Sequence, residues 1–310
     1  MNKVTNALKN PTKRQRDAAF VALMLSLPIL QFIVFWIVPN FNSILMAFRN
    51  PGNDGFTLIN FKRFWMLLTE ENSSVAPSIK NTIILFICTN FVNLPIVMFL
   101  SVVLFKKVPG YQIFRVVFYL PSILGASVTA ALYRYVVSND GPVELVLDWL
   151  GVEYSKQLGL LGNPETTFLM IIIYCLWTGV GVNMIMLNGA MARIPEDIFE
   201  SAKIDGVGFW REFFQIVCPL IWPTVTTLLV FGMSGIFTSY GATMLLAPNT
   251  PEASTIGWYI VRFTAAAGTG VTNEVLNYPA AVGLIFTIVG LPLVLVTKWL
   301  CEKIAQNVEY

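Results

Sequence analysis

Residue types that carry out covalent chemistry are scarce in this sequence of 310 residues. Histidine is absent, which removes the commonest general base and the commonest metal ligand. The four cysteines are Cys88, Cys175, Cys218 and Cys301. They are far apart and lie in or beside apolar segments, so we interpret them as small buried hydrophobic residues. Neither the phosphate-binding pattern G-x-x-x-x-G-K-[ST] nor the nucleophile pattern G-x-S-x-G occurs, and we expect neither a bound metal nor a bound cofactor.

The loop around residues 193–223 combines charged and apolar side chains in a way that no other part of the chain does. Pro195 is expected to begin a helix, because proline suits a first turn and acidic residues directly follow it at the positive end of the helix dipole. Gly206 and Gly208 are expected to end this helix, because glycine tolerates the left-handed conformation. A second short helix is expected to begin near Trp210.

The first of these two helices is amphipathic. Four residues at helical spacing form its apolar face: Ile198, Phe199, Ala202 and Ile204. Such a helix can lie on lipid headgroups, with Trp210 as an interfacial anchor. It can also dock into a groove of a cytoplasmic partner, with Glu200 and Asp205 fixing its orientation. The residues by themselves leave both interpretations open.

The elements that must position this loop are apolar helices. The chain is 55% hydrophobic and only 12% charged, with a mean hydropathy of +0.66, which is too little charge to cover a water-facing globule. A transmembrane helix needs about 20 mostly apolar residues. Six spans are predicted, at residues 18–39, 81–105, 116–133, 166–192, within 213–251, and at 275–297. The predicted fold class is therefore all-α, a polytopic membrane protein.

The apolar stretch 213–251 is too long for one straight span. We expect its start, with Pro219 and Pro223, to turn out of the cytoplasmic interface. Its end, from Gly241 to Pro251, is expected to lie outside the membrane or to re-enter it.

The distribution of basic residues predicts the orientation of the spans. With six spans, both termini and the 193–223 loop share one side, which holds 13 of the 20 Lys and Arg residues. Because cytoplasmic loops retain positive charge, both termini are predicted to be cytoplasmic. No long Lys/Arg run is present and the net charge is only +2, so we expect no nucleic-acid partner.

The loop also resembles the EAA loop of binding-protein-dependent ABC transporter permeases, in particular their carbohydrate-uptake (maltose/multiple-sugar type) branch. The matching residues in the loop are Glu200-Ser201-Ala202, Asp205-Gly206, Ile216 and Pro219. Further matches are Asn81-Thr82, Tyr119-Leu120-Pro121, and Trp177 with Gly179 and Gly181, so the resemblance covers about residues 77–303. The departures are Ser201 for alanine, Val207 for alanine, and Cys218-Pro219 for Leu-Pro, and none of them removes the acid or the glycine.

This resemblance implies a MetI-like permease of a type I ABC importer. It implies an N-terminal tail, first span and external loop over 1–76, a five-helix core over 77–303 with the coupling loop at 193–215, and a cytoplasmic tail over 304–310. The ATPase-coupling residues would be Glu200, Ser201, Ala202, Asp205 and Gly206.

The resemblance also implies the partners and the location of this chain. The partners would be a second, homologous permease subunit, a dimer of cytoplasmic ATPase subunits that bind the ATP, and an extracytoplasmic solute-binding protein. The chain would lie in the bacterial plasma (inner) membrane.

The substrate path is predicted where polar residues occur at membrane depth, because such residues are costly there unless they face a cavity or each other. The candidates are Asn90, Asn93, Asn183, Ser234, Thr238 and Tyr240. Amides, hydroxyls and aromatic faces suit a neutral sugar. For each of these residues, a helix–helix hydrogen bond is the alternative role.

Three other functions compete with an importer subunit. A secondary transporter or channel usually carries charged groups within its spans and often has inverted repeats, and neither is visible here. An intramembrane enzyme lacks a recognisable catalytic set. The third alternative is a membrane assembly factor that transports nothing, and only the EAA-like loop argues against it.

Overall fold

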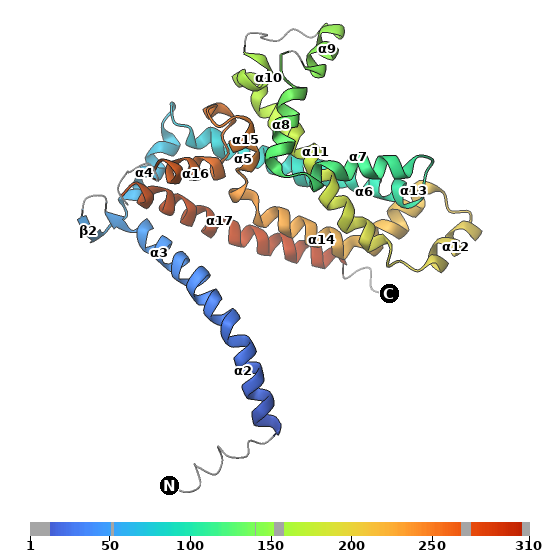
Figure 1. The fold of residues 1–310 in the computed structure, drawn as a ribbon, viewed down its shortest axis with the longest axis horizontal. Helices are drawn as coiled ribbons and strands as arrows, with labels where there is room; N and C mark the ends of the chain where they lie inside the picture. The colour runs from blue at the N-terminus through green and yellow to red at the C-terminus, as the bar shows by residue number, and fades with distance from the viewer. Residues whose placement is uncertain (1–12, 51–52, 140, 152–157, 268–273, 306–310) are drawn as a thin grey trace.

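The computed structural model describes residues 13–50, 53–139, 141–151, 158–267 and 274–305 (Figure 1). Most of these residues are helical, and the prediction of a helical membrane fold is confirmed. One short antiparallel hairpin departs from it, formed by β1 (Arg49–Asn50) and β2 (Asn53–Phe56). Of the C-terminal tail predicted over 304–310, the first two residues belong to the last helix and residues 306–310 lie outside the described residues, as do residues 1–12 of the predicted N-terminal tail.

Within the described residues, five helical segments are long and apolar enough to cross a membrane, and a bent helix pair makes a sixth. The five segments are Lys13–Ala47, Val75–Phe105, Pro164–Met191 (α11), Phe209–Ser234 and Leu276–Ile304, the last within α17 (Glu274–Ala305). All six predicted spans therefore have a counterpart. The helices continue past most of the predicted ends, because a charged residue ends an apolar stretch without ending a helix.

Three of the spans contain a π-helical turn, and each turn is followed within three residues by a proline. The first span consists of α2 (Lys13–Phe32), η1 (Ile33–Ile37) and α3 (Val38–Ala47), and its proline is Pro39. The second consists of α5 (Val75–Ile87), η2 (Cys88–Val92) and α6 (Asn93–Phe105), and its proline is Pro95. The fifth consists of α13 (Phe209–Glu212), η3 (Phe213–Val217) and α14 (Cys218–Ser234), and its proline is Pro219. A proline clashes with the carbonyl four residues before it, and in all three spans that carbonyl lies inside the π turn. The wider turn accommodates the proline and lets the helix continue.

The predicted turn at the start of the 213–251 stretch, with Pro219 and Pro223 leading out of the cytoplasmic interface, is therefore wrong. The helix passes through both prolines and ends at Ser234. After it come η4 (Ile236–Thr238), the short helix α15 (Gly241–Leu246) and η5 (Pro251–Ala253), so the chain is no longer one apolar helix, as expected for this part. The next helix, α16 (Ile256–Ala267), is not among the predicted elements.

The third span was predicted as a single helix and is in fact two. Helix α7 (Tyr111–Ile123) and helix α8 (Ala126–Val136) meet at an angle of 113°. The break lies at Leu124 and Gly125, whose backbones are extended. Helix α8 then leads to the short helices α9 (Pro142–Trp149) and α10 (Gly159–Gly162), at the top of Figure 1.

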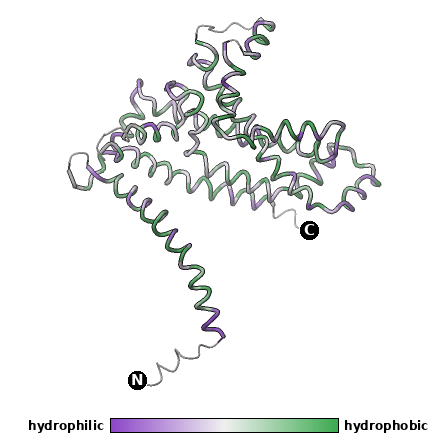
Figure 2. The backbone as a smooth tube through the Cα atoms, in the orientation of Figure 1, coloured by the Kyte–Doolittle hydropathy of each residue, from purple (hydrophilic) through white to green (hydrophobic). Residues whose placement is uncertain are grey.

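The first span stands apart from the other helices. Figure 1 shows α2 projecting from the body of the molecule, and Figure 2 shows it hydrophobic over most of its length. No residue of α2 or η1 is buried, whereas α3 packs against α17. Aromatic residues such as Phe35 and Trp36 are exposed on the first span, which is the surface expected of a helix that contacts lipid or another membrane helix.

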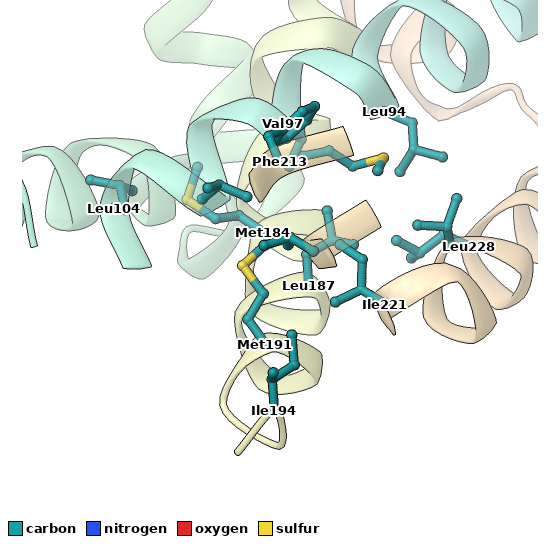
Figure 3. Packing of buried hydrophobic residues seen from close by; sticks show 14 residues of the cluster. Leu94, Val97, Leu104, Met184, Leu187, Met191, Ile194, Phe213, Ile221 and Leu228 are labelled. Carbon is teal, nitrogen blue, oxygen red and sulfur yellow. The ribbon is translucent and has the colours of Figure 1, made fainter. Parts of the chain in front are cut away.

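The largest apolar core joins α6, α11, η3 and α14 (Figure 3). Met184, Leu187 and Met191 of α11 are fully buried there, beside Val97 of α6 and Ile221 of α14. This core extends to Ile194, where the chain leaves α11 for the loop predicted to be functional. The loop is therefore attached to the most tightly packed part of the bundle.

Candidate functional site

The predicted amphipathic helix is present as α12 (Glu196–Ile204), at the end of the molecule opposite to α4 (Ile59–Thr69) in Figure 1. Pro195 directly precedes its first residue, so the helix begins one residue later than predicted. Its end is a Schellman motif: Val207 N donates to Ala202 O over 2.9 Å, and Gly206 N donates to Lys203 O over 3.1 Å. Gly206 has φ +69°, which confirms its predicted left-handed conformation.

Gly208 does not share that role. Its φ is −73° and its ψ is 162°, so its backbone is extended and any residue could adopt it. It directly precedes the second helix, α13, which starts at Phe209, one residue from the predicted start. Gly206 alone therefore ends the first helix, and Gly208 only joins the two.

Four of the five predicted coupling residues are exposed on the surface of this segment. They are Glu200, Ser201, Asp205 and Gly206. Ala202 is buried, and Ile198 and Phe199 are half-buried against the main core. Ile204, predicted to belong to the same apolar face, is 86% exposed, because the helix ends there and the chain turns away. One side of α12 thus attaches it to the bundle, and the other presents two acids to the outside.

An ion pair that the sequence analysis did not identify joins this segment to the second span. Lys106 Nζ, directly after the end of α6, lies 2.6 Å from Glu212 Oε2 at the end of α13. The Glu212 side chain is only 11% exposed, and Lys106 also lies over the ring of Phe209, 4.8 Å from its centroid. Glu212 is the last acid before a long apolar stretch, which is the only sign of this contact in the sequence.

A cavity of about 390 Å³ lies in the middle of the bundle, between the second, fourth and fifth spans. Asn90 of η2, Asn93 of α6 and Asn183 of α11 all line it, so the structure brings together three predicted path residues from two spans. Thr82, Thr89 and Ser239 add hydroxyl groups, which were not among the predicted site residues. The apolar lining includes Phe86 and Phe231.

The other three predicted path residues do not line this cavity. Ser234 and Thr238 are exposed, and their hydroxyls donate to the backbone at Phe231 O and Gly235 O. Tyr240 is 39% exposed at the start of α15. A substrate contact by these residues stays a prediction.

Glycines make room for the cavity amides. A Cβ at Gly179 would lie 2.7 Å from Asn93 Nδ2, and one at Gly232 would overlap the side-chain oxygen of Asn90. The Asn90 amide donates to Phe86 O over 3.1 Å, which fixes it along its own helix. Among the described residues, no hydrogen bond is made by the side chains of Asn93 and Asn183, so neither amide is committed to a protein partner. Asn183 is half-buried, whereas Asn93 is buried at the wall of the cavity.

Hydrogen bonds to Asn81 and to the lining residue Thr82 lie beside the cavity. Asn81 Nδ2 donates to Glu252 O over 2.6 Å and to Ser254 O over 3.0 Å. Thr82 Oγ1 accepts from Ile256 N over 2.8 Å, at the first residue of α16. The segment between α15 and α16 is thus fastened to the second span beside the cavity.

Comparison with known proteins assigns the chain to a protein family. Residues 73–310 match the family described as binding-protein-dependent transport system inner membrane component, which is more than half of the chain. The chain belongs to this family. It is an inner-membrane, multi-pass transport permease of the importer type, and the resemblance of its loop to this family is confirmed.

Characterised relatives of this permease are similar over most of their length. It is 25% identical over 267 residues to the arabinooligosaccharides transport system permease protein AraP of Halalkalibacterium halodurans, covering 84% of this chain and 81% of that protein. It is 26% identical over 273 residues to the lactose transport system permease protein LacF of Rhizobium radiobacter, covering 80% and 87%. A solved bacterial alginate ABC transporter, in complex with alginate pentasaccharide-bound periplasmic protein, matches with a TM-score of 0.78 and 25% identity, covering 94% of this chain and 96% of that one.

The geometry of the permease explains the matching residues outside the loop. Asn81 and Thr82 fasten the segment that precedes α16, and Gly179 makes room for Asn93. A Cβ at Gly181 would lie 2.9 Å from Phe118 O of α7, so this glycine permits close packing of the third and fourth spans. These residues therefore shape the cavity and its surroundings.

We expect Gly232→Ala to reduce transport by this permease strongly, by about tenfold or more, because the added methyl group must displace the Asn90 side chain from the cavity. The measurement is the initial rate of substrate uptake at equal membrane abundance. Gly283→Ala on α17 is the matched control, because nothing lies within 4 Å of the Cβ position there. Equal uptake by both variants would show that the Asn90 position does not matter.

Proposed function

We propose that this permease forms one half of the translocation path of an ATP-driven importer that takes up a saccharide. The observation that carries this proposal is the central cavity, in which three amides from two different spans converge at membrane depth. Polar groups at such depth cost free energy unless they face a cavity or bond to each other. Here the side chains of Asn93 and Asn183 make no hydrogen bond to any of the described residues.

The saccharide class is supported by the cavity chemistry and by the relatives. Amides and hydroxyls bond to sugar hydroxyls, and flat aromatic rings pack against the apolar faces of sugar rings. The relatives AraP and LacF are named for arabinooligosaccharides and lactose, and the similar solved transporter imports alginate. Each of these substrates is an oligomer of sugar rings.

We further propose that α12 couples this chain to a separate ATPase on the cytoplasmic side. Glu200, Ser201, Asp205 and Gly206 are exposed there, and Ala202 is buried, so the first four would contact the ATPase and the last would hold the helix in place. The ATP would be bound by the partner, because this chain has no phosphate-binding loop pattern. With α12 cytoplasmic, six spans place both termini in the cytoplasm of a bacterial cell.

Two further partners complete the proposed importer. A homologous second permease would cover the remaining side of the path, and an extracytoplasmic solute-binding protein would deliver the saccharide. The exposed first span offers an apolar surface for contact with lipid or with the second permease. Closure of the ATPase dimer would move α12 and the spans attached to it as a rigid body, which is a bistable change biased by ATP.

Reconstitution in proteoliposomes tests this proposal. The permease is combined with its partner permease, ATPase and solute-binding protein, and uptake of labelled oligosaccharides is measured with ATP inside the vesicles. We expect uptake to require hydrolysable ATP and to persist when ionophores collapse all ion gradients. An ATPase subunit with an inactivated catalytic site is the matched control, and it should abolish uptake.

A different energy source would contradict the proposal. Uptake that continues without ATP, or that stops when an ion gradient is collapsed, would assign the chain to a secondary transporter or a channel. Absence of saccharide uptake in the complete system, with a different solute imported instead, would refute the substrate class and leave the ATP-driven mechanism standing.

A further inference from the structure

None of the described residues that line the central cavity is Asp, Glu, Lys or Arg. The polar groups of this lining are the amides of Asn90, Asn93 and Asn183, the hydroxyls of Thr82, Thr89 and Ser239, and the thiol of Cys175. The amides and hydroxyls are neutral at every physiological pH, and the thiol carries no charge in its ordinary protonated form. The site can therefore satisfy hydroxyl groups and cannot neutralise a carboxylate.

Basic side chains near the cavity do not reach it. Lys106 lies 13 residues beyond Asn93 along α6, which is about 20 Å at 1.5 Å per residue, and it is engaged by Glu212. Lys80, near the opposite end, is exposed and is not part of the lining. Neither of these cations can compensate a negative charge placed between the three asparagines.

A uronate would therefore meet a large penalty in this cavity. An ionised carboxylate loses its hydration on entering an apolar, partly enclosed site, and neutral donors recover only part of that loss. A neutral sugar loses only the hydration of its hydroxyls, which the amides of Asn93 and Asn183 replace with hydrogen bonds. The difference in binding free energy between a uronate and the matching neutral sugar therefore comes from the carboxylate alone.

The similar proteins are named for both classes of saccharide. The solved transporter imports the acidic polysaccharide alginate, whereas AraP and LacF are named for neutral sugars. Similarity to these proteins therefore does not indicate the charge of the substrate of this chain. The lining of its own cavity is the observation that bears on that charge.

We propose that the cavity of this permease selects uncharged saccharides and rejects uronates. This inference rests on the proposed saccharide transport and adds the charge of the substrate to it. The selecting groups are Asn90, Asn93 and Asn183, which supply hydrogen-bond donors and acceptors without a net charge.

The test compares the binding of matched ligands to the membrane complex of two permeases and the ATPase subunits. The solute-binding protein is left out, so that its own selectivity does not contribute to the measured affinities. The importer is placed in nanodiscs without ATP, and the dissociation constants of a panel of neutral di- and trisaccharides are measured by isothermal titration calorimetry. Each is paired with the uronate that differs only at C6, for example galactobiose with digalacturonate. We expect every uronate to bind at least about tenfold more weakly than its neutral counterpart.

Two substitutions at one cavity position sharpen the comparison. Asn183→Lys adds a cation to the lining and is expected to move the uronate-to-neutral affinity ratio by about tenfold or more toward the uronate. Asn183→Leu keeps the number and branching of the side-chain heavy atoms and adds no charge, but it removes the amide, so it should weaken both ligands and leave the ratio unchanged. Size-exclusion profiles of both complexes verify that the variants assemble, and the wild-type comparison stands even if one of them does not.

The outcomes separate this inference from the proposed function. Uronates that bind as tightly as neutral sugars would overturn the inference and would show that a partner subunit supplies a cation. If neither class binds, while the proteoliposome assay still shows saccharide uptake, the cavity is not the selecting site and the inference fails alone. Failure of both assays would refute the proposed saccharide transport itself.

Discussion

Replacing Gly206 by valine is expected to lower ATP-dependent uptake by about tenfold or more while the chain remains in the membrane. Gly206 has φ +69°, and a residue with a Cβ pays about 1–2 kcal/mol there, with a β-branched residue at the upper end. That cost competes with the Schellman hydrogen bonds at Val207 N and Gly206 N. The end of α12 would then change direction, and with it the positions of Glu200 and Asp205.

Three other variants define what the Gly206 experiment measures. Gly206→Asn should retain most of the uptake, because asparagine tolerates the left-handed conformation. Gly208→Ala should behave as wild type, because its backbone is extended and nothing lies within 4 Å of the Cβ position. Glu200→Lys keeps the backbone and reverses one exposed charge, and it should abolish co-purification with the ATPase.

The result that would contradict the coupling role is specific. If Gly206→Val and Glu200→Lys both retain normal uptake and normal co-purification with the ATPase, then α12 is not the contact between the two subunits. The alternative interpretation, a helix that lies on lipid headgroups, would then be favoured.

Reversing the charge of Glu212 is expected to uncouple ATP hydrolysis from uptake, and reversing Lys106 at the same time is expected to restore much of the coupling. Glu212→Lys puts a second cation beside Lys106, at a site where the native Nζ–Oε2 distance is 2.6 Å and the acid is only 11% exposed, and losing one partner of such a pair costs about 3 kcal/mol or more. The contact joins the segment after α12 to the end of α6, and Asn93 is the first residue of α6. Loss of the ion pair thus weakens the attachment of the loop to a helix that lines the cavity, leaving aromatic contacts such as that of Phe105 with Phe199.

The measurement is the ratio of saccharide imported to ATP hydrolysed, at equal assembly of the complex. A role limited to folding would lower the amount of complex without changing this ratio. Lys106→Glu and Glu212→Lys should each lower the ratio, and the double variant should recover at least about half of it, since a double-mutant cycle isolates the pair. If the single variants keep the wild-type ratio, the ion pair does not transmit movement.

An exposed ion pair in the same protein is the matched control. Lys298 and Glu302 on α17 are 3.7 Å apart, and their side chains are 58% and 55% exposed. Such surface pairs contribute about 0–1 kcal/mol, so exchanging their charges should leave the ratio unchanged. Both pairs consist of a lysine and a glutamate. A different effect on the ratio would therefore come from the burial and position of the Lys106–Glu212 pair, and not from its charges.

Local patterns in the sequence predicted most of the elements and much of the loop. Apolar length located all six spans, because crossing the hydrocarbon sets a minimum that few other structures need. Pro195 and Gly206 marked the two ends of α12, because their backbone preferences act on the residue itself. The same reasoning failed for Pro219 and Pro223, because the helix continues through both. The π-helical turn Phe213–Val217 accommodates Pro219, and Pro223 lies within α14 where this helix packs in the main core.

Other features depend on residues that are distant in the sequence. The 113° break between α7 and α8 lies in an apolar stretch that reads as one span, and the angle depends on packing against α11. The pairing of Lys106 with Glu212 joins residues 106 positions apart, and Asn81 bonds to carbonyls 171 and 173 positions away. No local pattern can give such contacts, because they form only when separate helices meet.

By itself, the sequence determined that this protein spans the membrane, that it carries an amphipathic loop with a left-handed glycine, and that it has the residues of a binding-protein-dependent permease. Composition and local backbone preference are sufficient for the first two features, whereas the third rests on the resemblance of particular residues to a known family. Tertiary structure decided which polar residues face one cavity: it gathered Asn90, Asn93 and Asn183 and left Ser234 and Thr238 outside. The physical reason is that the direction a side chain faces depends on helix rotation and close glycine contacts, which only the packed bundle fixes.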